Sequence, residues 1–132
     1  MKLLQTAGRA MTGLPYMVFG YQSATEPGGR VAAAAPLLDR IRQAVPIPVD
    51  NETVVRANGA AQAVGGAMVA TGLGRRAGAA MIAASLVPTT VAGHAFWEYE
   101  DPMQRKLQET QFLKNLVMLG GVVAIAASAG RK

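Results

Sequence analysis

The chain alternates between long uncharged stretches and shorter charged segments. Four stretches contain no Asp, Glu, Lys or Arg: residues 10–25, 57–74, 77–97 and 115–130. An α-helix rises about 1.5 Å per residue, so about 20 residues cross the hydrocarbon core of a bilayer. The middle two stretches are long enough alone, and the outer two become so with a few flanking apolar residues. The pattern predicts four membrane-spanning helices at approximately residues 4–25, 54–74, 77–97 and 111–130.

Two cations fall within the predicted spans. Arg9 and Lys114 lie near the ends of the first and last spans, where a long side chain can reach the headgroups. Arg9 also interrupts the first apolar stretch, and no small-residue cleavage site follows it, so we expect a retained span rather than a signal peptide. A soluble Ala- and Gly-rich bundle is the alternative, and it is disfavoured because the uncharged stretches have no polar faces.

The segment between the first two spans has the pattern of a short amphipathic helix. Val31, Leu38 and Ile41 recur at helical spacing with charged residues between them, and Pro46 and Pro48 end the pattern. The fold class predicted is therefore all-α, a four-helix transmembrane bundle in a single domain spanning residues 1–132. The amphipathic helix would lie on its outer surface between spans 1 and 2.

Two helix starts have clear capping signals. Asp50 or Asn51 can cap the second span. Asp101 is followed by Pro102, which suits the first helical position, and by Gln104, which fits a capping box. We therefore expect the last helix to begin in water, ahead of its membrane-spanning part.

Small residues are expected to govern packing inside the membrane, because they let helix backbones approach closely. They occur on the second and fourth spans at Gly59, Ala63, Gly65, Gly66, Gly120, Ala124 and Ser128. Such faces are common in compact bundles and indicate no particular function.

The charges divide unequally between the two ends of the predicted bundle. One end holds both termini and the turn between the second and third spans, with six cations and no acid: Lys2, Arg9, Arg75, Arg76, Arg131 and Lys132. The other end holds seven cations and eight acids, so the net charge of +5 divides as +6 and −1. Cations concentrated in short loops and tails predict that both termini are cytoplasmic in a multi-pass protein of the cell membrane.

Composition excludes several classes of function. Only 16% of the 132 residues are charged, below the roughly 25% of soluble domains. The chain has no cysteine, which excludes disulfides, Cys-ligated metals and thiol nucleophiles. The excess of Lys and Arg over Asp and Glu is explained by the orientation of the chain in the membrane and by attraction to anionic lipids. No nucleic-acid-binding motif is present. No catalytic triad, phosphate loop or zinc spacing occurs, so we expect no independent catalysis and no metal.

Aromatic residues gather toward the end opposite the termini. All seven fall in that half, as expected for an interfacial belt: Tyr16, Phe19, Tyr21, Phe96, Trp97, Tyr99 and Phe112. The cytoplasmic half would be held by Arg and Lys instead.

Polar residues converge at the same depth as this belt. Asn58 and Gln62 are four residues apart and share one helix face. His94, Trp97 and Asn115 belong to the same leaflet. His94 could hydrogen-bond a quinone, act in a proton relay or ligate a cofactor. Alternatively, it could be a buried polar residue bonded to the second span. The five residues together predict a pocket in the outer leaflet.

Several motifs resemble the DoxX family of small membrane proteins. They are residues 58–66 (NGAAQAVGG), 72–77 (GLGRRA), 93–97 (GHAFW) and 111–116 (QFLKNL), with Arg9, Gly13 and Gly20 in the first span. The resemblance covers nearly the whole chain and implies four membrane helices. Position 62 is Gln where many relatives carry Glu. Gln can hydrogen-bond a quinone carbonyl but cannot titrate, which weakens a proton-transfer role at this position.

The resemblance implies a role beside redox enzymes. The family takes its name from a subunit associated with thiosulfate:quinone oxidoreduction and terminal oxidases. We therefore expect a non-catalytic accessory or anchoring subunit of a bacterial membrane oxidoreductase or respiratory assembly, with a possible homo-oligomer. Quinone is the one cofactor considered, bound at Asn58, Gln62, His94, Trp97 and Asn115. The alternatives are a helix-packing interaction protein without a cofactor and a transporter of small molecules or lipids.

Overall fold

The computed structural model describes residues 1–130, and this part of the chain contains helices and connecting loops without strands. Arg131 and Lys132, which contribute to the predicted cytoplasmic charge, lie outside the described residues. Five α-helices and one short 3-10 helix follow one another: α1 (Lys2–Thr25), α2 (Gly29–Ala44), α3 (Asn51–Thr71), α4 (Arg75–Gly93), η1 (Phe96–Glu98) and α5 (Pro102–Ser128). The all-α prediction is confirmed, as is the separate helix between the first two long ones.

Both predicted N-caps are present. The Asp50 carboxylate accepts a hydrogen bond from the backbone N–H of Thr53 at 2.7 Å, and Asp101 accepts one from Gln104 at 2.8 Å. Hydrogen bonds from Thr53 lower the pKa of Asp50. An ionised carboxylate at a helix N-terminus also interacts favourably with the helix dipole. Both caps thus fix the helix starts where the sequence indicated them.

Two helices end earlier than the uncharged stretches do. α3 stops at Thr71 rather than at residue 74 because Gly72 and Gly74 adopt positive φ angles of 84° and 64°, which glycine tolerates. α4 stops at Gly93 rather than at residue 97, and η1 follows. His94 is therefore the C-cap residue of α4 and not part of the helix.

The last turn of α1 is completed by a residue from α3. Arg56 donates hydrogen bonds to the backbone carbonyl oxygens of Ala24 at 2.6 Å and Thr25 at 2.9 Å. Glu52, one turn earlier on α3, holds the same guanidinium in an ion pair at 2.8 Å. The carbonyls that a helix leaves without partners at its C-terminus are thus satisfied by a distant part of the chain.

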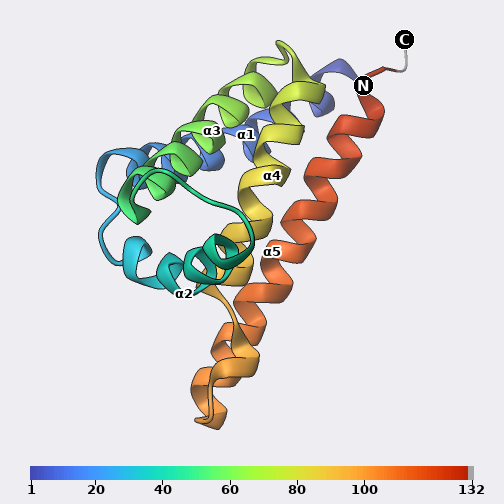
Figure 1. Cartoon of the computed structure of the whole chain (residues 1–132). Coiled ribbons are helices and arrows are strands. Elements are labelled where there is room, and N and C mark those ends of the chain that lie inside the picture. The colour runs from blue at the N-terminus through green and yellow to red at the C-terminus, as the bar shows by residue number, and fades with distance from the viewer. Residues whose placement is uncertain (131–132) are drawn as a thin grey trace.

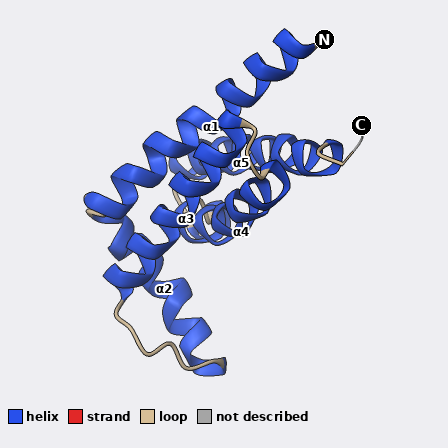
Figure 2. Ribbon diagram, turned by 90° about the horizontal axis from the view of Figure 1, so that it is seen from above, coloured by secondary structure: helices blue, strands red, loops and turns tan. Residues whose placement is uncertain are grey.

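The four long helices are arranged in the spatial order α1, α3, α4, α5 (Figures 1 and 2). The start of α1, the α3–α4 turn and the end of α5 lie at one end of the molecule, and α2 lies at the other. Arg9 lies against Gly72 in that turn, and Arg76 lies close to Gly130, in agreement with this placement. The expected gathering of the termini with the α3–α4 turn at one end is therefore present.

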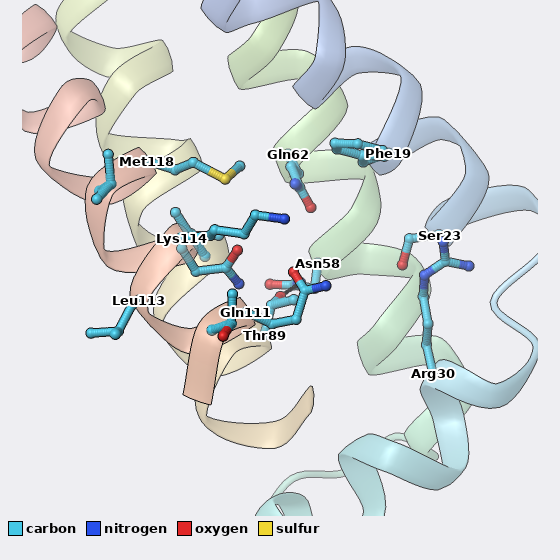
Figure 3. Close-up of a pocket in the computed structure, with 14 residues that line it drawn as sticks. Phe19, Ser23, Arg30, Asn58, Gln62, Thr89, Gln111, Leu113, Lys114 and Met118 are labelled. Atoms are coloured by element: carbon cyan, nitrogen blue, oxygen red, sulfur yellow. Dashed lines mark hydrogen bonds between the residues drawn. The ribbon is translucent and has the colours of Figure 1, made fainter. Parts of the chain in front are cut away.

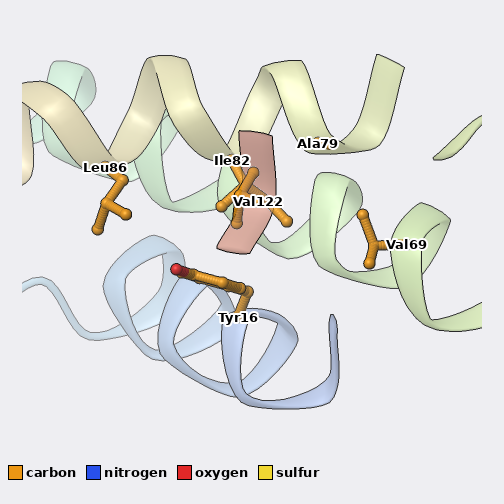
Figure 4. Packing of buried hydrophobic residues seen from close by; sticks show 6 residues of the cluster. All are labelled: Tyr16, Val69, Ala79, Ile82, Leu86 and Val122. Atoms are coloured by element: carbon orange, nitrogen blue, oxygen red, sulfur yellow. The ribbon is translucent and has the colours of Figure 1, made fainter. Parts of the chain in front are cut away.

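The core lies where α1, α3, α4 and α5 meet (Figure 4). It consists of Tyr16, Val69, Ala79, Ile82, Leu86 and Val122. Tyr16 is only 3% exposed, and its hydroxyl is buried without a hydrogen-bond partner in the described residues. The expectation that Tyr16 belongs to an interfacial aromatic belt is therefore wrong: it lies in the protein interior, whereas Phe19 and Tyr21 of the same helix are exposed.

The α1 and α3 backbones touch along a seam of four glycines: Gly13 and Gly20 on α1, Gly59 and Gly66 on α3. A Cβ atom placed on Gly59 would lie 2.7 Å from the backbone nitrogen of Ala24, and one on Gly66 would lie 2.6 Å from the carbonyl oxygen of Gly13. Non-bonded carbon atoms need about 3.5–4.0 Å. Only glycine fits at these positions, and we call this contact the α1–α3 seam.

Two segments are long and apolar enough to cross a membrane, residues Arg75–Glu98 and Pro102–Ser128. α1 and α3 have 24 and 21 residues, which is sufficient length. They fall short in hydropathy because Gly, Ala and polar residues make up much of both. Length and composition therefore support two of the four predicted spans.

Candidate functional site

A cleft separates the first half of α5 from α1 and α3 (Figure 3). It has a volume of about 790 Å³, and we call it the α5 cleft. It exists because α5 packs into the core through its second half, where Val122 is buried and Met118 and Leu119 pack beside it. Its lining comes from all five α-helices: Phe19, Ser23, Arg30, Asn58, Gln62, Leu86, Thr89, Thr110, Gln111, Leu113, Lys114, Asn115, Val117 and Met118.

A second, smaller cavity of about 340 Å³ lies beneath α2, and we call it the α2 cavity. Its walls are mostly apolar residues of α2, α3 and α4, with His94 at one side. Four residues line both spaces and mark their junction: Ser23, Arg30, Asn58 and Thr89. The two spaces are therefore neighbours, one covered by the amphipathic helix and one between α5 and the α1–α3 pair.

Asn58 and Gln62 both line the α5 cleft, in agreement with their shared helix face, and Asn58 also lines the α2 cavity. The Asn58 amide donates to the Thr89 hydroxyl at 3.0 Å, which links α3 to α4. Gln62 is 8% exposed, and its carbonyl oxygen lies 3.5 Å from the Ser85 hydroxyl, which also reaches the Asn58 backbone oxygen at 3.3 Å. These contacts join α3 to α4 while leaving both side chains on the wall of the α5 cleft.

Asn115 lies on the opposite wall of the same cleft. Its amide donates to the Thr90 hydroxyl at 3.0 Å, and Thr90 in turn donates to the carbonyl oxygen of Leu86. Asn115 thereby connects α5 to α4. Three of the five residues predicted for one pocket (Asn58, Gln62 and Asn115) thus line one space.

His94 lines the α2 cavity instead. Its Nδ1 atom lies 2.8 Å from the side-chain oxygen of Gln108 on α5, so the expectation of a bond to the second span is wrong. The physical reason is the end of α4 at Gly93, which directs the following residues toward α5. With the Gln108 oxygen as acceptor, Nδ1 is the donating ring nitrogen, and Nε2 is left for another partner.

Trp97 lines neither space. It stacks edge-to-face with Phe96 and Phe112, at ring-centroid distances of 5.2 and 5.9 Å, and is 48% exposed. Such aromatic pairs fix the connection between η1 and α5. The structure therefore divides the predicted pocket: three members line the α5 cleft, Asn58 and His94 line the α2 cavity, and Trp97 lies apart from both.

Two cations line the α5 cleft that the prediction from the sequence did not include. Lys114 extends from α5 toward Gln62, and Arg30 approaches from α2 near Ser23 (Figure 3). The cleft lining contains no Asp or Glu. The available sequence signal was the position of Lys114 within the last apolar stretch, which we interpreted as a headgroup contact.

The comparisons with known proteins identify the family. A search of curated proteins and a search of solved structures each returned no match. The sequence model of the DoxX family matches residues 4–95, which include all but the first two residues of α1, the whole of α2 to α4, and the predicted motifs up to residue 95. The match ends before α5, so it does not test the resemblance at residues 111–116. Because the match covers more than half of the chain, this protein belongs to the DoxX family.

Proposed function

We propose that this chain is a multi-pass protein of the bacterial cell membrane with four spanning helices, α1, α3, α4 and α5, and both termini in the cytoplasm. Each of the four has 19 to 27 residues, enough for about 30 Å of hydrocarbon. The outward surface of α1 supports its insertion despite its modest hydropathy. It exposes a run of apolar side chains: Leu3, Leu4, Met11, Leu14, Val18 and Phe19.

The proposed role is that of a non-catalytic accessory or anchoring subunit of a membrane oxidoreductase assembly. Membership of the DoxX family is the observation that supports this role. The side chains of α5 support it further, because most of this helix is exposed in the isolated chain. An exposed apolar helix is covered by lipid or by partner helices in a membrane.

We further propose that the α2 cavity holds a quinone headgroup. Its volume of about 340 Å³ and its apolar walls fit a compact ring, since small-molecule sites of about 300–1,000 Å³ are mostly apolar with few polar groups. Asn58 offers an amide that can donate to a quinone carbonyl, and His94 offers Nε2 to accept a quinol hydroxyl. Gln62 and Asn115 line the α5 cleft and are not required for this site.

The test is purification from native membranes in a mild detergent through a C-terminal tag. Mass spectrometry would identify copurifying proteins, and solvent extraction would quantify quinone in the same sample. We expect a stoichiometric redox enzyme and bound quinone in the unmodified protein. His94→Ala combined with Asn58→Ala should lose the quinone, while the control Gln62→Ala should retain it. A clean preparation without a redox partner or quinone would refute both parts of the proposal.

A further inference from the structure

The α5 cleft presents two positive side chains to a space with apolar walls and no acid in its lining. Lys114 forms no hydrogen bond or ion pair with any of residues 1–130, and Arg30 has a single contact of 3.3 Å to the backbone oxygen of Glu26. Four other cations of the outer segments are paired with an acid: Arg40, Arg42, Arg56 and Lys106. Lys114 and Arg30 share with Arg105 the lack of an acidic partner within residues 1–130, and of these three only Lys114 and Arg30 line the α5 cleft.

Both side chains are exposed in the isolated chain; once lipid surrounds the cleft, each cation is unfavourable among apolar groups unless an anion or water reaches it. The residues around the two cations could contact both the polar headgroup and the apolar chain of an amphiphilic ligand. Asn58, Gln111 and Asn115 provide amide groups beside the cations, while Leu113, Val117 and Met118 continue along α5 as an apolar wall. Polar recognition groups at one level with an apolar wall beyond them match a charged headgroup followed by an acyl chain.

We propose that the α5 cleft is a binding site for an anionic phospholipid, with the lipid phosphate between Lys114 and Arg30. Charge complementarity selects this occupant, because both side chains bind phosphate readily and no acid in the lining offsets them. The opening between α5 and the α1–α3 pair lets a lipid enter sideways from the bilayer. The site rests on the membrane placement proposed above and does not depend on quinone in the α2 cavity.

The experiment uses the full chain, delipidated in a non-ionic detergent and titrated with phosphatidylglycerol or phosphatidylcholine. Native mass spectrometry counts the lipids bound per chain. We expect one phosphatidylglycerol to bind in preference to the zwitterionic lipid. Lys114→Gln should weaken its binding about fivefold, the effect of one cation near an anionic lipid surface. The double variant Lys114→Gln with Arg30→Gln should bind phosphatidylglycerol more weakly still. Lys114→Arg should bind it as the unmodified protein does, because the positive charge is kept.

Lys106→Gln is the matched control. Lys106 lies on the same helix outside the cleft lining and is paired with Glu109, so its removal changes the net charge equally. Circular dichroism establishes that each variant keeps its helices. Equal losses in Lys106→Gln and Lys114→Gln would overturn the proposal, and so would equal binding of the two lipids. Displacement of the lipid by inorganic phosphate at millimolar concentration would also overturn it, by showing a site for the free anion.

Quinone extraction from the same variants separates this proposal from the previous one. Lys114→Gln should bind phosphatidylglycerol more weakly and keep its quinone, because Lys114 does not line the α2 cavity. His94→Ala should show the opposite pattern. Loss of both ligands in both variants would contradict the assignment of two separate sites.

Discussion

The α1–α3 seam and helix α5 both contain glycines, but the glycines have different surroundings in the two regions. At the seam, glycines on both helices bring backbone against backbone, and an added Cβ would collide with main-chain atoms. On α5, Gly120 and Gly121 have no atoms within 4 Å of such a Cβ. Here the contact is made by side chains such as Val122 in the core. Small residues therefore indicate close packing only where the facing helix also presents its backbone.

This difference explains where the α5 cleft occurs. The seam is too close to admit a ligand along most of its length. Only the second half of α5 reaches the core, whereas the first half contacts α4 and η1 through Gln108, Phe112 and Asn115. The first half therefore stands away from α1 and α3 and leaves the α5 cleft open. The closely packed α1 and α3 form one wall of the α5 cleft, and the first half of α5 forms the opposite wall.

The largest change in stability is expected from a substitution that separates α1 from α3 at the α1–α3 seam. Gly66→Ala places a methyl group 2.6 Å from the Gly13 oxygen and 2.7 Å from the Met17 nitrogen, and neither backbone atom can move without separating the helices. We expect a loss of about 3 kcal/mol, at the upper end for overpacked interiors. The measurement is unfolding by SDS in mixed micelles, followed by circular dichroism.

The matched control is Gly121→Ala on α5. Nothing obstructs the new methyl group there, so we expect unchanged stability or a gain of up to about 1 kcal/mol from the higher helix propensity of alanine. A similar loss of stability in Gly66→Ala and Gly121→Ala would show that the glycines of the seam are no more closely packed than those of α5.

A smaller effect tests the side-chain contact of α5. Val122 is 1% exposed and its neighbour Val123 is 55% exposed. Val122→Ala leaves a void among core residues and should lower the free energy of unfolding by about 1–2 kcal/mol. Val123→Ala should change it by less than about 0.5 kcal/mol. The same unfolding assay compares them, and equal effects would argue against burial of this face of α5.

The smallest effect concerns pH and the start of α3, beside the seam. The pKa of Asp50 is lowered by its hydrogen bonds from Thr53, so its ionised form favours the folded state. This contribution is fully present above the ordinary value of about 4 and is lost as the pH falls through the lowered pKa of the folded state. Stability of the unmodified protein should therefore fall in acid more than that of Asp50→Asn. Parallel pH profiles of the two proteins between pH 2 and about 6 would contradict this.

The helical elements could be predicted well because their signals are local. The capping residues Asp50 and Asp101 and the terminating prolines near residue 46 each act within one turn. Helix ends set by glycine were predicted less well. An uncharged stretch continues through Gly72 to residue 74, while α3 stops at Thr71 because Gly72 adopts a positive φ.

The candidate site could be predicted only in part, because its remaining members depend on how the helices pack. Asn58 and Gln62 share a face by helical geometry alone, and the structure keeps them together. His94 follows the end of α4, so its partner Gln108 depends on the path of the chain into η1 and α5. Lys114 enters the cleft only because half of α5 stands away from α1, which no local pattern indicates.

The hydrogen bonds from Arg56 to the end of α1 bear on the order of assembly. This arginine follows Ala24 by 32 residues, so α1 is synthesised well before the group that satisfies its last carbonyls. Until α3 arrives, water or headgroups must serve those oxygens, and the final turn of α1 is free to fray. Maturation of the first helix is thus coupled to delivery of the second long one. The end of α1 and the start of α3 therefore become complete together.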